Sequence, residues 1–358
     1  MATSVETPDL EIRATIGVDT HADVHVAVAL DQLGRRLGAI EIPTTTAGFN
    51  QLVDWASHFG VVEQFGIEGT SSYGAGLCRW LQAQGLVVVE VDRPDRTTRR
   101  SKGKSDPIDA EAAARTVLSG EARGTPKSQD GPVEQIRVLR VAKRSAVKNL
   151  TMATNQMWAL VTTAPQDLRD QLRDLSTREL VEVAAGFRFA DDPDTIVHTT
   201  KYTLRELARR HQQLTEQLDR LTTQLERLVA DTAPELVERY GIGTDSAGQL
   251  LVTAGDNPDR LESEAAFAHL CATAPLPATS GKQQTRHRLN HQGGDRQANA
   301  ALHRIAIVRL CHEQRTQDYI AKRQREGKSK KEAIRCVKRY IAREVYKILR
   351  DNPHLAPA

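Results

Sequence analysis

The chain has few of the features that place a protein in a membrane or cross-link it. Aromatic residues make up only 4% of its 358 residues, and no apolar run approaches the roughly 20 residues that cross a bilayer. The first residues lack a positive start followed by an apolar core and so do not predict a secretory signal. The four cysteines show no Cys-x-x-Cys spacing of a zinc site or a redox pair. We therefore expect a cytoplasmic protein without a membrane anchor, whose cysteines are reduced.

The small net charge of +3 hides an asymmetry along the chain. Residues 282–350 contain 19 Lys and Arg against 6 Asp and Glu, and the residues before them carry an acidic excess. Phosphate backbones are attracted to such a segment because binding releases condensed counterions. A solvated basic helix would have the same composition, so charge alone makes the C-terminal part a candidate polyanion binder and no more.

The length allows two or three domains, and the first follows a recognisable order of strands and helices. Apolar alternation predicts strands, and apolar spacings of three and four predict helices. In this domain, residues 12–130, we expect strands at 14–19, 24–30 and 37–42, a helix at 47–58, a strand at 64–68, a helix at 69–81, a buried strand at 86–91 and a helix from Asp106. This order predicts an α/β fold with a mixed sheet of the ribonuclease-H or RuvC-like type, although fold order alone proves no chemistry.

Residues 131–232 predict a second domain that is helical and contains a coiled coil. Spacings of three and four alternate along one segment, at Leu204, Leu207, His211, Leu214, Leu218, Leu221, Leu225 and Leu228. This leucine seam would pair with a helix of the same chain or of a second protomer, and its narrow apolar stripe favours self-association. A long helix folded onto its own domain is the alternative.

Residues 233–350 predict a third, mainly helical domain. Its start contains Gly241–Ile242–Gly243 between two predicted short helices, which is the arrangement of a helix-hairpin-helix turn. In such a turn the free backbone N–H groups of the second helix can hold a phosphate. An ordinary turn between two helices is the other interpretation.

Four acidic residues fit one metal site in this topology. Asp19 ends the first strand and Glu68 ends the strand after the first helix, and these strands are expected to be neighbours at the sheet centre. Asp106 and Asp109 lie three positions apart where Pro107 favours the first turn of a helix, so both can face one way. Clustered carboxylates repel one another unless a cation holds them, and Mg²⁺ prefers such oxygen ligands. The alternative for each acid is a helix cap or a solvated surface position.

A basic loop and two histidine pairs are further candidates for binding phosphate or metal. A basic loop that could deliver a phosphate backbone to the metal precedes the acidic pair, with Arg93, Arg96, Arg99, Arg100, Lys102 and Lys104. Two histidine pairs, His21 with His25 and His287 with His291, are spaced by four. On strands or loops that spacing does not converge on a metal, so we assign neither pair as ligands.

Three blocks of the sequence resemble the signature blocks of the DEDD transposases of the IS110 insertion-sequence family. They are GVDTHADVHVAVALDQLGR, FGIEGTSSYGAGL and KSDPIDAEAAAR. The resemblance continues through GIGTDSAGQLLVTAGD and through FAHLCATAPLPATSGKQQTRHRLNHQGGDRQANAALHRIA, which is similar to the family's C-terminal transposase domain. It implies a DNA transposase whose tetrad, in the order Asp, Glu, Asp, Asp, is Asp19, Glu68, Asp106 and Asp109.

The resemblance also implies a nucleophile and partners. Ser280, followed by Gly281, stands at the position of the family's attacking serine, and Lys282, Arg286 and Arg288 could hold the strand that is cut. Without the resemblance, Ser280 would be interpreted as a turn serine. The family further implies donor and target DNA as substrates, a structured noncoding RNA that pairs with both, and assembly as a dimer or a tetramer.

Three hypotheses remain open at this point. The first is a recombinase in which the four acids bind Mg²⁺ and Ser280 attacks a DNA phosphodiester. The second is a RuvC-like junction nuclease in which metal-activated water cuts and Ser280 only positions the phosphate. The third is a noncatalytic nucleic-acid-binding protein that uses the basic C-terminal part and the leucine seam.

Overall fold

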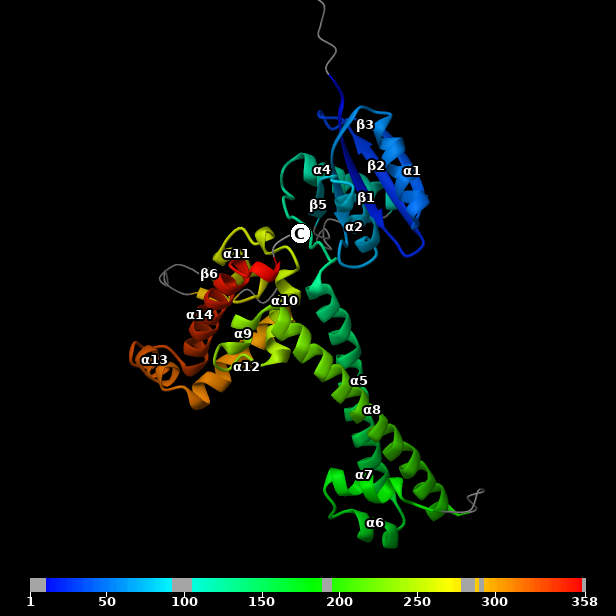
Figure 1. Cartoon of the computed structure of the whole chain (residues 1–358), viewed down its shortest axis with the longest axis vertical. Coiled ribbons are helices and arrows are strands. Elements are labelled where there is room, and N and C mark those ends of the chain that lie inside the picture. Colours follow the sequence, from blue (N-terminus) through cyan, green and yellow to red (C-terminus); the bar gives the residue numbers. More distant parts are fainter. Residues whose placement is uncertain (1–10, 92–104, 189–194, 278–286, 290–292, 356–358) are drawn as a thin grey trace, which may run out of the picture. The chain divides into compact units, whose positions relative to one another are not determined.

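The computed structural model describes residues 11–91, 105–188, 195–277, 287–289 and 293–355. The chain divides into two compact units (Figure 1). We call the first the sheet unit, which comprises Met1–Gly131, Ala254–Phe267 and Leu349–Ala358. The second, the helical unit, comprises Pro132–Thr253 and Ala268–Ile348. Within the described residues, no helix combines the length and the apolar character that crossing a membrane requires.

The sheet unit is built on one five-stranded mixed sheet in the order β3-β2-β1-β4-β5. Strand β1 pairs antiparallel with β2 and parallel with β4, and β5 extends the sheet parallel to β4. The predicted order of strands and helices is confirmed, and so is the central position of the first and fourth strands. The elements are β1 (Arg13–Thr20), β2 (Val24–Leu30), β3 (Arg36–Pro43), α1 (Thr46–Ser57), β4 (Val61–Glu68), α2 (Ala75–Ala83), β5 (Val88–Val91) and α4 (Asp106–Leu118).

The central strand β1 is buried on both faces, as expected for a strand covered by helices on each side. Ile16 and Val18 belong to the core that also contains residues of α1 and α2. Gly17 lies on the opposite face, where a Cβ atom would be 2.0 Å from the carbonyl oxygen of Ala110 in α4. Glycine at this position therefore lets α4 lie directly against the strand that carries Asp19.

The prediction that a helix begins at Gly69 was wrong, because α2 begins at Ala75. Gly69 has a φ of 66°, in the left-handed region that a right-handed helix does not contain. Its carbonyl oxygen accepts hydrogen bonds from the backbone N–H groups of Ser72 and Gly74, which forms a turn after β4. The glycines thus make a separate loop at the carboxyl end of β4, and the helix starts beyond it.

The helical unit contains two long helices that pack side by side, α5 and α8 (Figure 1). Leu204 and Leu225 of the leucine seam are fully buried, whereas Leu214, Leu218 and Leu221 between them are only half-buried. The seam therefore has a partner helix within the chain, and part of its apolar surface stays accessible. The first elements of this unit are α5 (Pro132–Thr163), α6 (Gln166–Leu172), α7 (Thr177–Ala185) and α8 (Ile196–Thr232).

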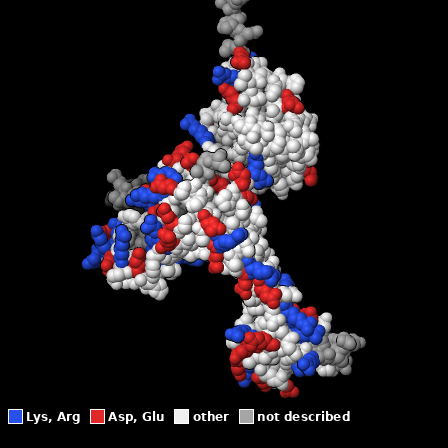
Figure 2. All heavy atoms as spheres, viewed as in Figure 1, with Lys and Arg blue, Asp and Glu red and all other residues white. Residues whose placement is uncertain are grey.

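The rest of the helical unit is mainly helical, as predicted, with one short hairpin. Gly241 has a φ of 78° and turns the chain between two helices, of which the first has only 5 residues. Lys and Arg side chains gather over α13 and α14 on the face shown in Figure 2. The remaining elements are α9 (Pro234–Glu238), α10 (Thr244–Ala254), η1 (Pro258–Arg260), α11 (Glu264–Leu270), β6 (Pro275–Pro277), β7 (His287–Leu289), α12 (Arg296–His312), α13 (Gln314–Arg325), α14 (Lys330–Arg350) and η2 (Pro353–Leu355). The boundary between the two units falls within α10, α11 and α14.

Candidate metal centre

The predicted acidic residues lie at the carboxyl ends of the two central strands and at the start of α4. Side chains alternate between the two faces of a strand, so Asp19 shares a face with Gly17. Glu68 likewise shares a face with Gly66, where a Cβ atom would be 2.6 Å from Val117 of α4. Asp106 and Asp109 both belong to the first turn of α4. All four acids therefore belong to the face of the sheet that α4 covers.

Two of these carboxylates converge on a histidine. Nε2 of His21 lies 3.2 Å from Oδ2 of Asp19 and 3.5 Å from Oδ1 of Asp106. One ligand atom from each of the three residues lies within 4.8 Å of the others. Donor atoms this close together can share one cation, because metal–oxygen and metal–nitrogen bonds are about 2.0 to 2.6 Å long.

The imidazole of His21 directs its buried Nε2 atom at the carboxylates of both Asp19 and Asp106. Its lone pair is therefore placed to bind a cation that the two carboxylates share. The set of two carboxylates and one imidazole matches the ligands that divalent metals take in proteins.

The electrostatics of Asp19 point the same way. Burial raises the pKa of its carboxyl above the usual value; His21 opposes this shift, and the nearby carboxylates of Asp109 and Asp106 add to it. Asp19 is therefore a carboxylate that water does not fully stabilise and that negative neighbours surround. A cation bound at this point would favour the ionised form.

The other two predicted ligands lie close by, outside the three-atom group. Asp109 is 7% exposed and near enough to act on the charge of Asp19. Glu68 is 4% exposed, and its backbone oxygen accepts a hydrogen bond of 2.9 Å from Oγ1 of Thr20. This bond joins the ends of β1 and β4. That all four acids hold one metal centre stays a prediction.

His21 is the residue that spacing arguments missed. Its spacing of four from His25 does not predict a shared metal site, and in the structure the two rings have different surroundings. His25 is 1% exposed and stacks on Phe49, with 6.1 Å between ring centroids. His21 instead lies in the short turn between β1 and β2, two positions after Asp19. The Asp-x-His sequence at a strand end was the available signal for His21 as a candidate ligand. The turn between β1 and β2 brings its Nε2 atom to the carboxylates of Asp19 and Asp106.

A cavity of about 500 Å³ adjoins this centre. Its lining includes His21 and Asp106 together with Asp23, Glu41 and the half-exposed Tyr73. Because most of its charged lining residues are carboxylates, a phosphate would be repelled there unless cations neutralised them. The cavity would therefore accept a polyanion only when metal cations are bound.

Two protein-family models match this chain. Residues 16–164 match a family model of DEDD transposases of the IS110 type, described as transposase. Residues 234–321 match a second one, described as transposase of the IS116/IS110/IS902 family. The chain belongs to the IS110 family of transposases. No curated protein matches it.

Membership of the IS110 family establishes the general activity and agrees with the centre described above. A transposase cuts and rejoins DNA, so DNA is the substrate. The DEDD type of this family implies dependence on a divalent metal, for which the cluster of Asp19, His21 and Asp106 is a candidate.

Several residues that we predicted for this transposase lie outside the described part of the chain. For Arg288, which belongs to β7, the structure describes the backbone only. The others are Ser280, Lys282 and Arg286, and the basic loop residues Arg93, Arg96, Arg99, Arg100, Lys102 and Lys104. Their roles stay predictions.

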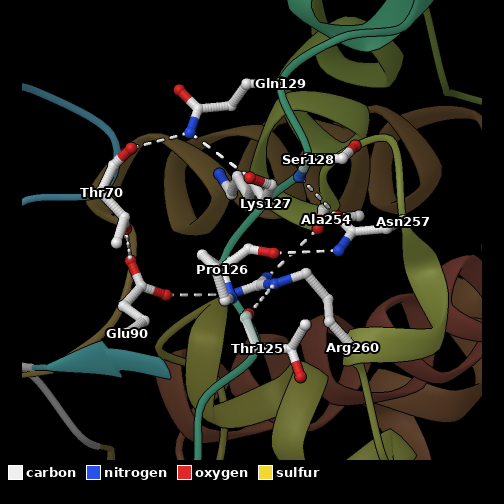
Figure 3. A network of polar contacts seen from close by, with 10 residues as sticks. All are labelled: Thr70, Glu90, Thr125, Pro126, Lys127, Ser128, Gln129, Ala254, Asn257 and Arg260. Atoms are coloured by element: carbon white, nitrogen blue, oxygen red, sulfur yellow. Dashed lines mark hydrogen bonds and ion pairs between the residues drawn. The ribbon is translucent and has the colours of Figure 1, made fainter. Parts of the chain in front are cut away.

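The two matched regions of the IS110-family chain meet in a polar network within the sheet unit (Figure 3). Arg260 comes from the second region, and its guanidinium lies 3.4 Å from Oε2 of Glu90 in β5. The other carboxylate oxygen of Glu90 accepts a hydrogen bond of 2.6 Å from Thr70, two positions after Glu68. Nε2 of Gln129 donates to the backbone oxygen of Thr70 at 2.8 Å. The loop that follows Glu68 is therefore held in place by residues from distant parts of the sequence.

Proposed function

We propose that this transposase cuts and rejoins DNA by metal-dependent transesterification, with Mg²⁺ as the metal and Ser280 as the nucleophile. The observation that carries the metal part of the proposal is the convergence of Asp19, His21 and Asp106 within 4.8 Å. The strand order and the position of the acids also support a ribonuclease-H or RuvC-like sheet domain. The division into domains 12–130, 131–232 and 233–350 belongs to the same proposal.

Asp19 and Asp106 would hold the metal directly, together with the imidazole of His21. Asp109 and Glu68, the other two predicted ligands, would complete the metal centre, and each is placed by a rigid element, the first turn of α4 and the end of β4. Bound metal would supply charge neutralisation and polarisation of a phosphate oxygen. The protein contributes the fixed carboxylates and the adjoining cavity, which is large enough for a sugar–phosphate segment.

Ser280 would attack the phosphorus of a DNA phosphodiester. A bond forms between its Oγ and phosphorus, the bond from phosphorus to one deoxyribose oxygen breaks, and that oxygen leaves as a hydroxyl group with the proton. The number of phosphodiester bonds is conserved, so the later attack of a DNA hydroxyl on the phosphoserine can rejoin strands without an added energy source. A serine hydroxyl needs activation for this step, either by a base or by the metal centre. The basic residues Lys282, Arg286 and Arg288 would hold the strand.

A noncoding guide RNA and self-association belong to the same proposal. The family resemblance supports the RNA, and the strongly basic segment 282–350 supports a nucleic-acid partner in general. The half-buried leucines Leu214, Leu218 and Leu221 support a homo-oligomer, dimer or tetramer, because they leave apolar surface along α8. Replacing Leu214 and Leu218 with Glu should shift the particle mass measured by light scattering to that of the monomer. Unchanged mass would remove this support.

The nucleophile is tested by a pair of neighbouring hydroxyl residues. Ser280→Ala should abolish strand cleavage and the covalent DNA–protein adduct, whereas Thr279→Ala should retain both. The competing junction nuclease predicts the opposite for Ser280→Ala, because metal-activated water would still cut. Near wild-type nicking by that variant would reject the serine mechanism.

The metal centre is tested separately. Asp19→Asn and Glu68→Gln should eliminate recombination of a donor and target pair and leave DNA binding in place, because the metal centre is needed for strand cleavage and not for binding. Equal recombination by Glu68→Gln would favour the noncatalytic binding protein. Glu63→Gln, at a partly exposed position on the same strand as Glu68, serves as the control and should recombine normally.

A further inference from the structure

The helical unit contains a cavity of about 350 Å³ with an unusual concentration of positive charge. Five of the described residues that line it are basic, namely Arg140, Lys143, Arg144 and Lys148 of α5 and Arg304 of α12. The only carboxylate among these lining residues is Asp245, in the first turn of α10. The excess of positive charge in the sequence lies beyond residue 281, yet four of these five cations precede it.

Helix geometry explains how the four cations of α5 come together. Positions 140, 143, 144 and 148 follow the spacings of three and four that place residues on one face of a helix. At about 1.5 Å rise per residue, the row from Arg140 to Lys148 is ~12 Å long. Along a duplex axis each strand carries a phosphate about every 3.4 Å, so the row can face three or four phosphates.

Asp245 neutralises one end of this row. Its Oδ2 atom lies 3.0 Å from Nζ of Lys143, and its Oδ1 atom lies 3.6 Å from a guanidinium nitrogen of Arg140. Arg140 also donates hydrogen bonds to the backbone oxygen of Asp245 and to Oε1 of Gln249, at 2.7 and 2.9 Å. Arg140 therefore holds α5 to α10, and its 9% exposure leaves it little contact with solvent.

The other three cations are available to a ligand. Arg144, Lys148 and Arg304 are exposed, and none of them forms an ion pair or a side-chain hydrogen bond within the described residues. Burial lowers the pKa of Arg140, and the charges of Arg304 and Arg144 contribute to the shift, while Asp245 opposes it. The cations are thus close enough to repel one another, and an anion between them would remove that repulsion.

We propose that this basic cleft binds the phosphodiester backbone of a nucleic acid. Neighbouring cations along one helix face match a repeating polyanion better than a single small anion. Contacts of this kind position a nucleic acid and carry no base specificity. The assignment rests on the proposed function only in taking nucleic acid as the partner, and it adds the basic face of α5 to the predicted basic segments.

The test compares two triple variants of the full chain that each remove three positive charges. The cleft variant is Arg144→Gln, Lys148→Gln and Arg304→Gln, all at exposed positions whose truncation leaves the core intact. The control variant is Arg137→Gln, Arg173→Gln and Arg178→Gln, whose side chains are already paired with Glu134, Asp170 and Glu182. Binding is measured by fluorescence anisotropy in EDTA over a range of salt concentrations. The probes are a mixed-sequence duplex DNA, the single-stranded DNA and an RNA hairpin, each labelled with fluorescein.

The cleft variant should flatten the dependence of log Kd on log salt by about 2 to 3 for the duplex, at ~0.9 per phosphate contact, and by about 2 for the single strand. A change confined to the RNA probe would identify RNA as the occupant, a change confined to the DNA probes would identify DNA, and a change with all probes would identify a shared backbone site. Slopes that stay at the wild-type value with every probe, or that change equally in the control variant, would overturn the assignment.

A second variant changes the charge in the opposite direction. Asp245→Asn keeps the size of the side chain and removes the carboxylate, so it should tighten binding and steepen the salt dependence. Weaker binding to every probe would contradict the proposal. Because EDTA prevents metal-dependent cleavage, these outcomes do not depend on whether Asp19→Asn or Ser280→Ala behaves as proposed above.

Discussion

Arg260 and Glu90 are separated by 170 positions in the sequence, yet their side chains lie 3.4 Å apart inside the sheet unit. The guanidinium of Arg260 also donates to the backbone oxygens of Thr125 and Ala254, at 2.9 and 3.2 Å. Its side chain is 11% exposed, and that of Glu90 is 31% exposed. The pair therefore attaches the segment after α10 to the edge strand β5, next to the loop that follows Glu68.

Arg260→Met should destabilise the sheet unit by roughly 2 to 3 kcal/mol, because it leaves Glu90 without its cation and two backbone oxygens without a donor. The control is Arg13→Met, which breaks an ion pair with Glu63 whose arginine side chain is 62% exposed and should cost well under 1 kcal/mol. Calorimetric melting of both variants measures the difference. Equal melting temperatures would show that the Arg260 network does not contribute to stability.

Gly17→Ala should separate α4 from the sheet. The added Cβ would lie 2.0 Å from the carbonyl oxygen of Ala110, and a backbone atom cannot move without the helix. We expect the free energy of unfolding to fall by ~1 to 3 kcal/mol. Binding of divalent metal should also weaken, since α4 carries Asp106 and Asp109. Titration calorimetry with Mn²⁺ and thermal melting measure the two effects.

The matched control for this prediction is Gly76→Ala in α2. Its Cβ would meet nothing closer than 3.8 Å from Phe49, so the substitution should be neutral or stabilise the protein by ~0.5 to 1 kcal/mol. If Gly17→Ala behaved like Gly76→Ala, the close approach of α4 to β1 would not be needed for the centre.

The parts of the centre that local patterns determine were predictable from the sequence. Alternation along β1 and β4 and the proline at the start of α4 are short-range features, and they correctly placed Asp19 and Glu68 on neighbouring central strands and Asp106 at a helix start. The long leucine spacing likewise identified α8. What the pattern left open was its partner helix, because the same stripe fits a helix of the same chain or of a second one.

The remaining features depend on contacts that no local pattern encodes. The position of His21 depends on how the turn between β1 and β2 folds back on α4. The attachment of Arg260 to Glu90 and the basic cleft each depend on elements that are far apart in sequence. The start of α2 differs from its predicted position for a local reason, because the left-handed Gly69 closes a separate turn before the helix.

His21→Ala should weaken the binding of divalent metal at least about tenfold, in line with the 10- to 100-fold effect of removing even indirect supports of metal sites. The loss should be larger for Mn²⁺ than for Mg²⁺, because imidazole is a better ligand for transition metals. Titration calorimetry measures both affinities. His58→Ala, at an exposed position where Nδ1 of the ring lies 2.6 Å from the backbone oxygen of Asp54, should bind metal like the wild type. Identical affinities for His21→Ala and His58→Ala would remove His21 from the ligand set.

We expect Lys338 to make the stability of the helical unit depend on pH. Its Nζ donates to Oδ1 of Asn299 at 2.5 Å, and the Asn299 amide donates to the backbone oxygens of Cys271 and Ala272. This chain of bonds connects α14, α12 and the turn before β6. Burial lowers the pKa of Lys338 to about 8, with the charge of Arg335 as a smaller cause.

The sign of the effect follows from proton counting. Between about pH 8 and pH 10.5 the unfolded chain still binds the Lys338 proton that the folded chain has released, so this residue makes the free energy of unfolding rise with pH. Below about pH 8 the lysine is charged in both states, and its burial has its full cost, on the order of 3 kcal/mol. The stability advantage of Lys338→Met over the wild type should therefore be greatest at neutral pH and shrink as the pH rises from about 8 to 10.5.

Melting temperatures measured across this pH range, with the exposed Lys347→Met of the same helix as control, give the difference. A difference between Lys338→Met and wild type that stays constant with pH would show that Lys338 titrates alike in the folded and unfolded chains.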